Sequence, residues 1–178
     1  MHADERQAIT ELYERHAAAL HRYALSRSDR ETAEEVTAQV FLVAWRRRAA
    51  LPDDPLPWLY GVARRSLADQ RRGASRRLRL GARLKSNAPA PDPDQDLPDR
   101  GLGQALGRLS QLDREVLLLR YWEELEPAEI ARAIGRSKTA TKVRLHRARN
   151  RMRRELDAQT DEPIKLAERS REVKAESL

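Results

Sequence analysis

Three stretches in the first half of the chain carry apolar side chains at helical spacing. Residues 4–27 repeat apolar or aromatic positions every three or four residues, which indicates an amphipathic helix. Ser28 and Glu31 form an S-x-x-E capping box for a second helix over about 29–50. A third helix is predicted over about 57–73, after the proline-rich loop LPDDPLP. The apolar stripes consist of Ile9, Leu12, Tyr13, His16, Leu20 and Tyr23 in the first helix, Ala33, Val36, Val40, Phe41, Val43, Ala44 and Trp45 in the second, and Leu59, Val62, Ala63 and Leu67 in the third.

A proline- and aspartate-rich stretch separates this half from the second. Residues 84–99 read LKSNAPAPDPDQDLPD, a composition that is typical of an extended linker. Beyond it, leucines predict a short helix at 102–109, and Ser110 is placed to cap a leucine-rich helix over about 111–124. The fold class is therefore predicted to be all-α, with two small helical domains joined by a flexible linker. The predicted divisions are a domain at 4–80, the linker at 81–100, a second domain at 101–156 and a charged, disordered tail at 157–178.

The stretch 126–154 combines a short helix, a turn and a longer basic helix. Pro127 suits the first position of a helix, Gly135 suits the left-handed residue that ends one, and Ser137 can cap the next. An inward stripe follows at spacings of four, three and four, formed by Thr141, Leu145, Ala148 and Met152. This order of elements is the sequence form of a helix-turn-helix, whose second helix enters a DNA major groove.

Positive charge is concentrated in two blocks of the chain. Residues 136–154 contain nine Arg or Lys and no acid, and residues 64–85 contain nine against the single acid Asp69. Like charges at this density repel one another along a helix, so an anionic partner explains them better than an ordinary solvated basic helix does. The net charge of +7 and the pI near 10.2 also favour a polyanion. Two separate blocks suggest a protein that grips nucleic acid in two places.

Other classes of protein find little support. No segment approaches the ~20 apolar residues of a spanning helix, and the N-terminal segment has no apolar signal-peptide core, so a cytoplasmic protein is expected. The absence of cysteine excludes disulfides and thiolate metal sites, and the four histidines form no cluster at ligand spacing. Motifs for a nucleophile elbow, a phosphate-binding loop or a dinucleotide site are missing. We therefore expect no catalytic residues, no metal, no cofactor and no enzymatic activity.

Three stretches together resemble a known family. They are AEEVTAQVFLVAW (33–45), PWLYGVARRSLADQRR (57–72) and LGRLSQLDREVLLLRYWEELEPAEIARAIGRSKTATKVRLHRAR (106–149). In this order and spacing the chain, over about 9–156, resembles bacterial RNA polymerase sigma factors of the sigma-70 family, in the small two-domain group called extracytoplasmic-function (ECF) sigma factors. The first stretch is similar to region 2.2, which in the family grips the clamp helices of the polymerase β′ subunit. The second is similar to regions 2.3 and 2.4, which open and read the −10 promoter element, and the third to region 4, which reads the −35 element.

The resemblance implies three sets of contact residues. The −35 set is Arg136, Ser137, Lys138, Thr139, Thr141, Lys142, Arg144, Arg147 and Arg149, the last two on phosphates. The −10 set is Trp58, Tyr60, Arg64, Arg65, Asp69, Arg71 and Arg72. The polymerase set is Glu34, Glu35, Ala38, Gln39, Phe41 and Trp45. A role in the core is the favoured alternative for Trp58 and an equal alternative for Tyr60. Phe41 and Trp45 are predicted to face the core on one edge and the partner on the other.

The resemblance also implies partners and leaves alternatives. The expected partners are core RNA polymerase, through its β′ clamp helices and β flap, and promoter DNA. Many members are inhibited by an anti-sigma protein, although no residue here indicates one; no small-molecule substrate and no direct membrane insertion are expected. Arg65, Ala140 and Thr141 differ from residues common in the family, so the promoter sequence does not follow. A stand-alone helix-turn-helix regulator, with DNA binding confined to 102–156, is the main alternative, and an adaptor that sequesters other factors is a third.

Overall fold

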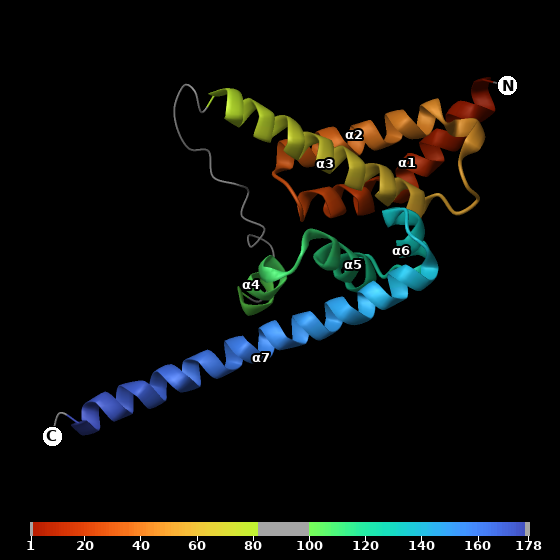
Figure 1. The fold of residues 1–178 in the computed structure, drawn as a ribbon. Coiled ribbons are helices and arrows are strands. Elements are labelled where there is room, and N and C mark those ends of the chain that lie inside the picture. Colours follow the sequence, from red (N-terminus) through yellow and green to blue (C-terminus); the bar gives the residue numbers. More distant parts are fainter. Residues whose placement is uncertain (1, 82–99, 177–178) are drawn as a thin grey trace.

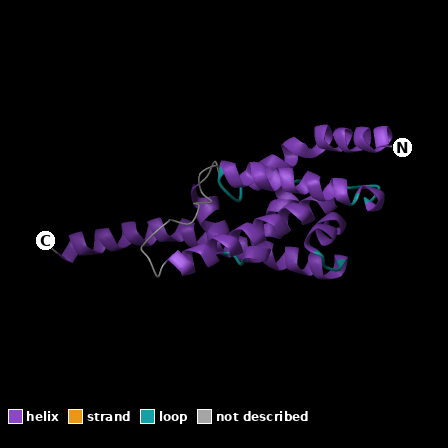
Figure 2. Ribbon diagram, turned by 90° about the horizontal axis from the view of Figure 1, so that it is seen from above, coloured by secondary structure: helices purple, strands orange, loops and turns teal. Residues whose placement is uncertain are grey.

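A computed structural model describes residues 2–81 and 100–176, and within these ranges the regular elements are all helices (Figures 1 and 2). The elements are α1 (His2–Leu25), α2 (Arg30–Arg46), a 3-10 turn (Arg48–Ala50), α3 (Leu56–Gly81), α4 (Arg100–Arg108), α5 (Gln111–Tyr121), α6 (Pro127–Ile134) and α7 (Lys138–Glu176). The predicted all-α class is confirmed. None of these described helices is long and apolar enough to cross a membrane.

Helices α1, α2 and α3 form the N-terminal bundle (Figure 1). The predicted capping box at the start of α2 is wrong by one residue: Asp29 is the N-cap, and its carboxylate accepts a 2.8 Å hydrogen bond from the amide of Thr32. Ser28 lies one residue before this cap, and its hydroxyl donates to the carbonyl of Ala24 near the end of α1, at 2.8 Å. Tyr13, predicted to be inward, is 51% exposed, and the centre of its ring lies 4.8 Å from that of Phe41.

Two helices extend beyond their predicted ends. Helix α3 continues past Gly73 to Gly81, and α7 continues through the tail 157–176, where disorder was predicted. Both extensions are rich in Arg, Ala, Leu, Glu and Lys, which are strong helix formers, whereas Gly73 costs α3 about 1 kcal/mol and Pro163 costs α7 about 3 kcal/mol. Composition therefore outweighs the local breaks. The predicted linker lies outside the described residues over 82–99.

The two domains pack against each other, which the sequence did not predict. Helix α6 lies under α3 in Figure 1, and one apolar core runs through both halves. A Cβ built on Gly61 of α3 would lie 3.0 Å from the carbonyl oxygen of Ala133 in α6, so any larger residue here requires the two helices to shift apart by a few tenths of an ångström. Arg132 adds an ion pair with Asp54 of the N-terminal half at 2.7 Å. The free chain is thus closed upon itself.

Candidate nucleic-acid and polymerase interfaces

The helix-turn-helix forms at the predicted residues because each boundary has its own local signal. Pro127 is the first residue of α6, and a reciprocal capping box closes the helix at Glu126. Gly135 ends α6 in the left-handed conformation, with φ at 66°. The hydroxyl of Ser137 accepts a 3.2 Å hydrogen bond from the amide of Ala140 and caps α7. The predicted inward stripe of α7 is buried at all four positions, Thr141, Leu145, Ala148 and Met152.

Most residues of the predicted −35 set lie on the opposite, exposed face. Those with exposed side chains are Arg136, Ser137, Lys138, Thr139, Lys142, Arg147 and Arg149. Thr141 departs from the predicted exposed position, because its side chain is fully buried and its hydroxyl donates to the carbonyl of Ser137 at 2.9 Å. The helical period that places Thr141 in line with Leu145 also turns it away from any groove. The burial of Thr141 in this structure counts against the predicted contact with DNA.

Arg144 points toward α5, where it meets a carboxylate that the sequence analysis missed. Its Nη1 donates a 2.8 Å hydrogen bond to Oδ1 of Asp113, and Oδ2 accepts from Arg151. Burial opposes the charged form of Asp113, but hydrogen bonds from Ser110, Arg151 and Arg144 outweigh it and hold the pKa of this carboxyl below its usual value of 3.8. The sequence spacing could have indicated this buried carboxylate. Asp113 precedes Val116 by three residues and therefore lies on the same, buried face of the helix.

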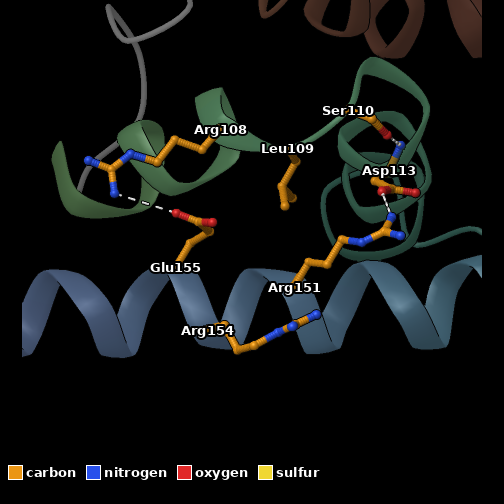
Figure 3. Close-up of a pocket in the computed structure, with 7 residues that line it drawn as sticks. All are labelled: Arg108, Leu109, Ser110, Asp113, Arg151, Arg154 and Glu155. Carbon is orange, nitrogen blue, oxygen red and sulfur yellow. Dashed lines mark hydrogen bonds and ion pairs between the residues drawn. The ribbon is translucent and has the colours of Figure 1, made fainter.

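A basic hollow adjoins this carboxylate. It measures about 530 Å³ between α4, α5 and α7, and Figure 3 shows Asp113 and Arg151 meeting at one side and Arg108 and Glu155 at the other. The Arg108–Glu155 pair spans 3.4 Å. Both carboxylates in the lining are paired with arginines, and Arg154 adds a further cation. The hollow is therefore positively charged, like the exposed face of α7.

The predicted −10 set lies along α3 and divides into two groups. Arg65, Asp69, Arg71 and Arg72 are exposed, and Trp58 is half-buried. Tyr60 is only 2% exposed, and Nη2 of Arg64 lies 3.5 Å from the carbonyl of Ile134 in α6. Two of the seven predicted residues therefore face the C-terminal domain in this arrangement.

A buried polar network surrounds Tyr60 and joins the domains. The Tyr23 hydroxyl donates to Oε1 of Glu115 at 2.6 Å, and Nε of Arg27 donates to Oε2 of the same carboxylate at 3.1 Å. Tyr60 donates to Oε2 of Glu123 at 2.8 Å, while Nη1 of Arg27 lies 3.9 Å from Oε1. Burial raises the pKa of Tyr23, Tyr60 and Glu123, because each loses contact with water in the interface. These partners are about 60 to 90 residues apart along the chain, and no local pattern predicts them.

The network is not complete. Nη2 of Arg27 and Nε of Arg64 are buried without a hydrogen-bond partner among the described residues. A buried donor left unpaired costs about 1–3 kcal/mol. The closed arrangement therefore combines hydrogen-bonded groups with two buried donors that would gain a partner in water.

The predicted polymerase set lies on the outer face of α2, with one correction. Glu34, Glu35, Ala38 and Gln39 are exposed and Trp45 is half-buried. Phe41 is only 7% exposed and packs on the ring of Tyr13 at a centroid distance of 4.8 Å, so it is not available to a partner. Leu42, which was not predicted, is 42% exposed and lines a groove of about 780 Å³ between α2 and α3. Gln70 of α3 donates to Glu35 across this groove at 2.8 Å.

Two family models match the chain over both halves. The model described as Sigma-70 region 2 matches residues 12–77, and the model described as Sigma-70, region 4 matches residues 99–152. The first covers most of the α1–α3 bundle and the second covers the helix-turn-helix. A chain that carries both regions in this order falls in the sigma-70 class of transcription factors.

Comparison with individual relatives shows which group of the sigma-70 class the chain resembles. The chain is 36% identical over 154 residues to the ECF RNA polymerase sigma factor SigL of Mycobacterium tuberculosis strain H37Rv, covering 82% of this chain and 87% of that one. It is 31% identical over 156 residues to the ECF RNA polymerase sigma factor BldN of Streptomyces coelicolor, covering 82% and 59%. The chain belongs to the ECF group of sigma-70 family sigma factors.

Solved structures agree on the fold. The sigma factor RpoE in complex with the anti-sigma factor NepR from Bartonella quintana superposes with a TM-score of 0.66 at 23% identity, covering 85% of this chain and 98% of that one. CnrH in complex with the cytosolic domain of CnrY gives a TM-score of 0.61 at 27% identity, covering 86% and 90%. As a sigma factor, the chain binds core RNA polymerase and directs it to promoters through their −10 and −35 elements, and the alternative of a stand-alone regulator is set aside.

Proposed function

We propose that α7 reads the −35 element with the exposed residues near its N-terminus. Lys138, Thr139 and Lys142 lie there on a face without acids, and the first residues of a recognition helix are those that reach base edges. Arg136 and Ser137 precede them at the turn. Arg147 and Arg149 lie farther along the exposed face and meet phosphates, which raises affinity without reading sequence. The observation that supports the proposed −35 role is the exposed basic face of α7, which lies opposite its buried stripe.

The test is Lys142→Ala in reconstituted holoenzyme. We expect transcription from a promoter with its native −35 element to fall about tenfold or more, because a base contact is worth ~1–3 kcal/mol of discrimination. Arg153→Ala is the matched control, since it removes an equally exposed cation from the same helix beyond the proposed contacts. Equal losses in both variants, or no loss in Lys142→Ala, would remove the base-reading role.

We propose further that α3 binds the −10 element after the two domains separate. A base stacks only on an aromatic face that it can reach, and Tyr60 is covered by the C-terminal domain. Arg64 is likewise turned to α6. The residues proposed for this role are Trp58, Tyr60, Arg64, Arg65, Asp69, Arg71 and Arg72. The closed arrangement is then the form of the free chain, and the open one is the form that holds promoter DNA.

The outer face of α2 is proposed as the contact with the β′ clamp helices of the polymerase. Glu34, Glu35, Ala38, Gln39 and Leu42 share this face, and Trp45 lies at its end. Acidic and amide groups beside one exposed leucine give the polar rim and apolar centre that protein interfaces use. The β flap remains a predicted partner of the C-terminal domain.

An inhibitory protein partner is proposed from the relatives alone. RpoE and CnrH were each solved with a bound partner, named an anti-sigma factor in the first case. We also propose that this chain catalyses no reaction itself and acts in the cytoplasm beside the polymerase. The domain limits 4–80 and 101–156, with a linker that spans the promoter elements, stay predictions.

A further inference from the structure

One buried carboxylate ties the recognition helix to the helix behind it. Asp113 of α5 is 0% exposed, and each of its two oxygens accepts a hydrogen bond from a different arginine of α7. Oδ1 binds Nη1 of Arg144 at 2.8 Å, and Oδ2 binds Nη1 of Arg151. The amide of Asp113 in turn donates to the hydroxyl of Ser110 at 3.2 Å, which anchors the start of α5.

The two arginines are spaced to act together. They are seven residues apart, which is two helical turns or about 10 Å along one side of α7. Their side chains are 40% and 48% exposed, so they flank the buried stripe without belonging to the outer face. Two directional bonds to one carboxylate fix both how far α7 lies along α5 and how it is rotated about its own axis.

Rotation of α7 matters because the apolar contacts alone specify it weakly. The buried stripe is formed by Thr141, Leu145, Ala148 and Met152, and apolar burial is non-directional. A rotation of α7 about its own axis changes which side chains face a groove. Two charge-assisted hydrogen bonds, one from each arginine to its own oxygen of a fixed carboxylate, supply the missing direction.

We propose that Asp113 is a positioning residue for promoter recognition: by holding Arg144 and Arg151 against α5, it sets the rotation at which Lys138, Thr139 and Lys142 meet the −35 bases. This inference rests on the proposed −35 role of α7. It also removes Arg144 from the residues that read bases, where the sequence had placed it, and gives the guanidinium a structural partner inside the protein.

The proposal has a signature that separates it from base reading and from simple stabilisation. A residue that contacts one base pair loses discrimination at that base pair only. A residue that orients the whole helix loses discrimination at every position of the element. A residue that only stabilises the fold lowers occupancy of all promoters equally and leaves the preferences intact.

The experiment measures holoenzyme binding to a promoter and to every single-base variant of its −35 element. For Asp113→Asn we expect preferences to flatten by about tenfold across all positions, while affinity for a scrambled element stays equal or rises, because a negative charge near DNA has been removed. Arg144→Gln should flatten all positions more weakly, by about threefold, since Arg151 still holds Asp113. The double variant Asp113→Asn/Arg144→Gln should be no worse than Asp113→Asn alone, because Arg144→Gln removes a contact that Asp113→Asn has already weakened.

Other outcomes overturn the proposal in distinguishable ways. Loss of preference at a single base pair in Arg144→Gln assigns base reading to Arg144 itself, and unchanged preferences in both single variants leave Asp113 a purely structural role. If Asp113→Asn does not fold by circular dichroism, Arg144→Gln and Arg151→Gln carry the same test, because each keeps Asp113 paired with the other arginine. Lys142→Ala is measured beside them. If it too leaves the base preferences unchanged, the −35 role of α7 fails. If Lys142→Ala loses base preference while the Asp113 and Arg144 variants keep theirs, only the positioning role is removed.

Discussion

The hydroxyl of Tyr60 donates a 2.8 Å hydrogen bond to Oε2 of Glu123, which joins the helix proposed to hold the −10 element to the end of the helix behind the recognition helix. The bond hides an aromatic ring that DNA needs to reach. It also keeps Glu123 out of water, and burial raises the pKa of this carboxyl. A single interface therefore covers part of one proposed DNA surface while leaving the other, on α7, exposed. We therefore expect binding of the free chain to single-stranded −10 DNA to be controlled by domain opening.

The first prediction concerns the carboxylate at the centre of this interface. Glu115→Ala leaves the guanidinium of Arg27, whose side chain is 7% exposed, without its main partner. Removing one member of a buried ion pair costs about 3–5 kcal/mol, and separation of the domains relieves this cost by hydrating Arg27. We expect a larger radius of gyration by small-angle X-ray scattering and stronger binding to single-stranded −10 DNA. Glu11→Ala, at an exposed site of α1, is the control; an unchanged radius in both variants would contradict the opening model.

The second prediction uses the close approach of α3 and α6. Gly61→Ala places a methyl group 3.0 Å from the carbonyl oxygen of Ala133, and this overpacking costs about 1–3 kcal/mol at the interface. Within α3 itself, alanine is a better helix former by about 1 kcal/mol. We therefore expect looser domain closure by scattering, without loss of helix by circular dichroism.

The matched control for that substitution is another helical glycine. Gly107→Ala in α4 meets nothing within 4 Å, so it should stabilise the chain by about 0.5–1 kcal/mol and leave closure unchanged. If Gly61→Ala changes stability and domain closure in the same way as Gly107→Ala, the two helices adjust freely and the glycine is not needed for packing.

The third prediction tests the α2 surface. Leu42 is 42% exposed, so Leu42→Ala should leave stability nearly unchanged. If the β′ clamp helices cover this face, the loss of a buried leucine side chain at the interface should weaken binding to core polymerase by about tenfold, which is roughly 1.4 kcal/mol. Val143→Ala removes an apolar side chain of similar exposure, 45%, from α7 and should not change polymerase affinity in the absence of DNA. Fluorescence titration of core enzyme distinguishes the two.

Features with a local cause were predictable from the sequence. Pro127 and Gly135 fix the ends of α6 through their own backbone preferences, and Ser110 and Ser137 cap helices with their own hydroxyls. The stripe on α7 followed from helical period alone. Ser28 failed as a cap because α2 begins at Arg30, one residue later than the motif implies, which leaves Asp29 in the cap position.

Features that depend on distant partners were not predictable. Tyr60 and Arg64 have the pattern of a DNA-binding helix, yet they are covered by a domain more than 60 residues away. Arg144 has the pattern of a base-reading residue, and Asp113, 31 residues earlier, turns it inward. Charge and spacing indicate which residues can contact DNA, whereas the fold decides which of them are free to do so.

The fourth prediction follows from the pKa of Asp113. This pKa is lowered in the folded chain because hydrogen bonds from Ser110, Arg151 and Arg144 outweigh the burial that opposes its charge. The folded state therefore binds a proton less readily than the unfolded state does. The ionised carboxylate therefore stabilises the folded chain. This contribution is fully present at pH values above the usual pKa of 3.8, and it is lost as the pH falls through the lower pKa of the folded state.

Asp113→Asn should accordingly be less stable than the native chain at neutral pH, by on the order of 1–3 kcal/mol, because two arginines lose a charged partner. As the pH falls below 3.8 and through the lower folded pKa, the native carboxylate becomes protonated and the two proteins should converge in stability. Urea unfolding at a series of pH values measures this difference, and the other carboxyl groups cancel because both proteins contain them. A gap that stays constant down to the lowest pH would mean that Asp113 contributes through packing rather than through its charge.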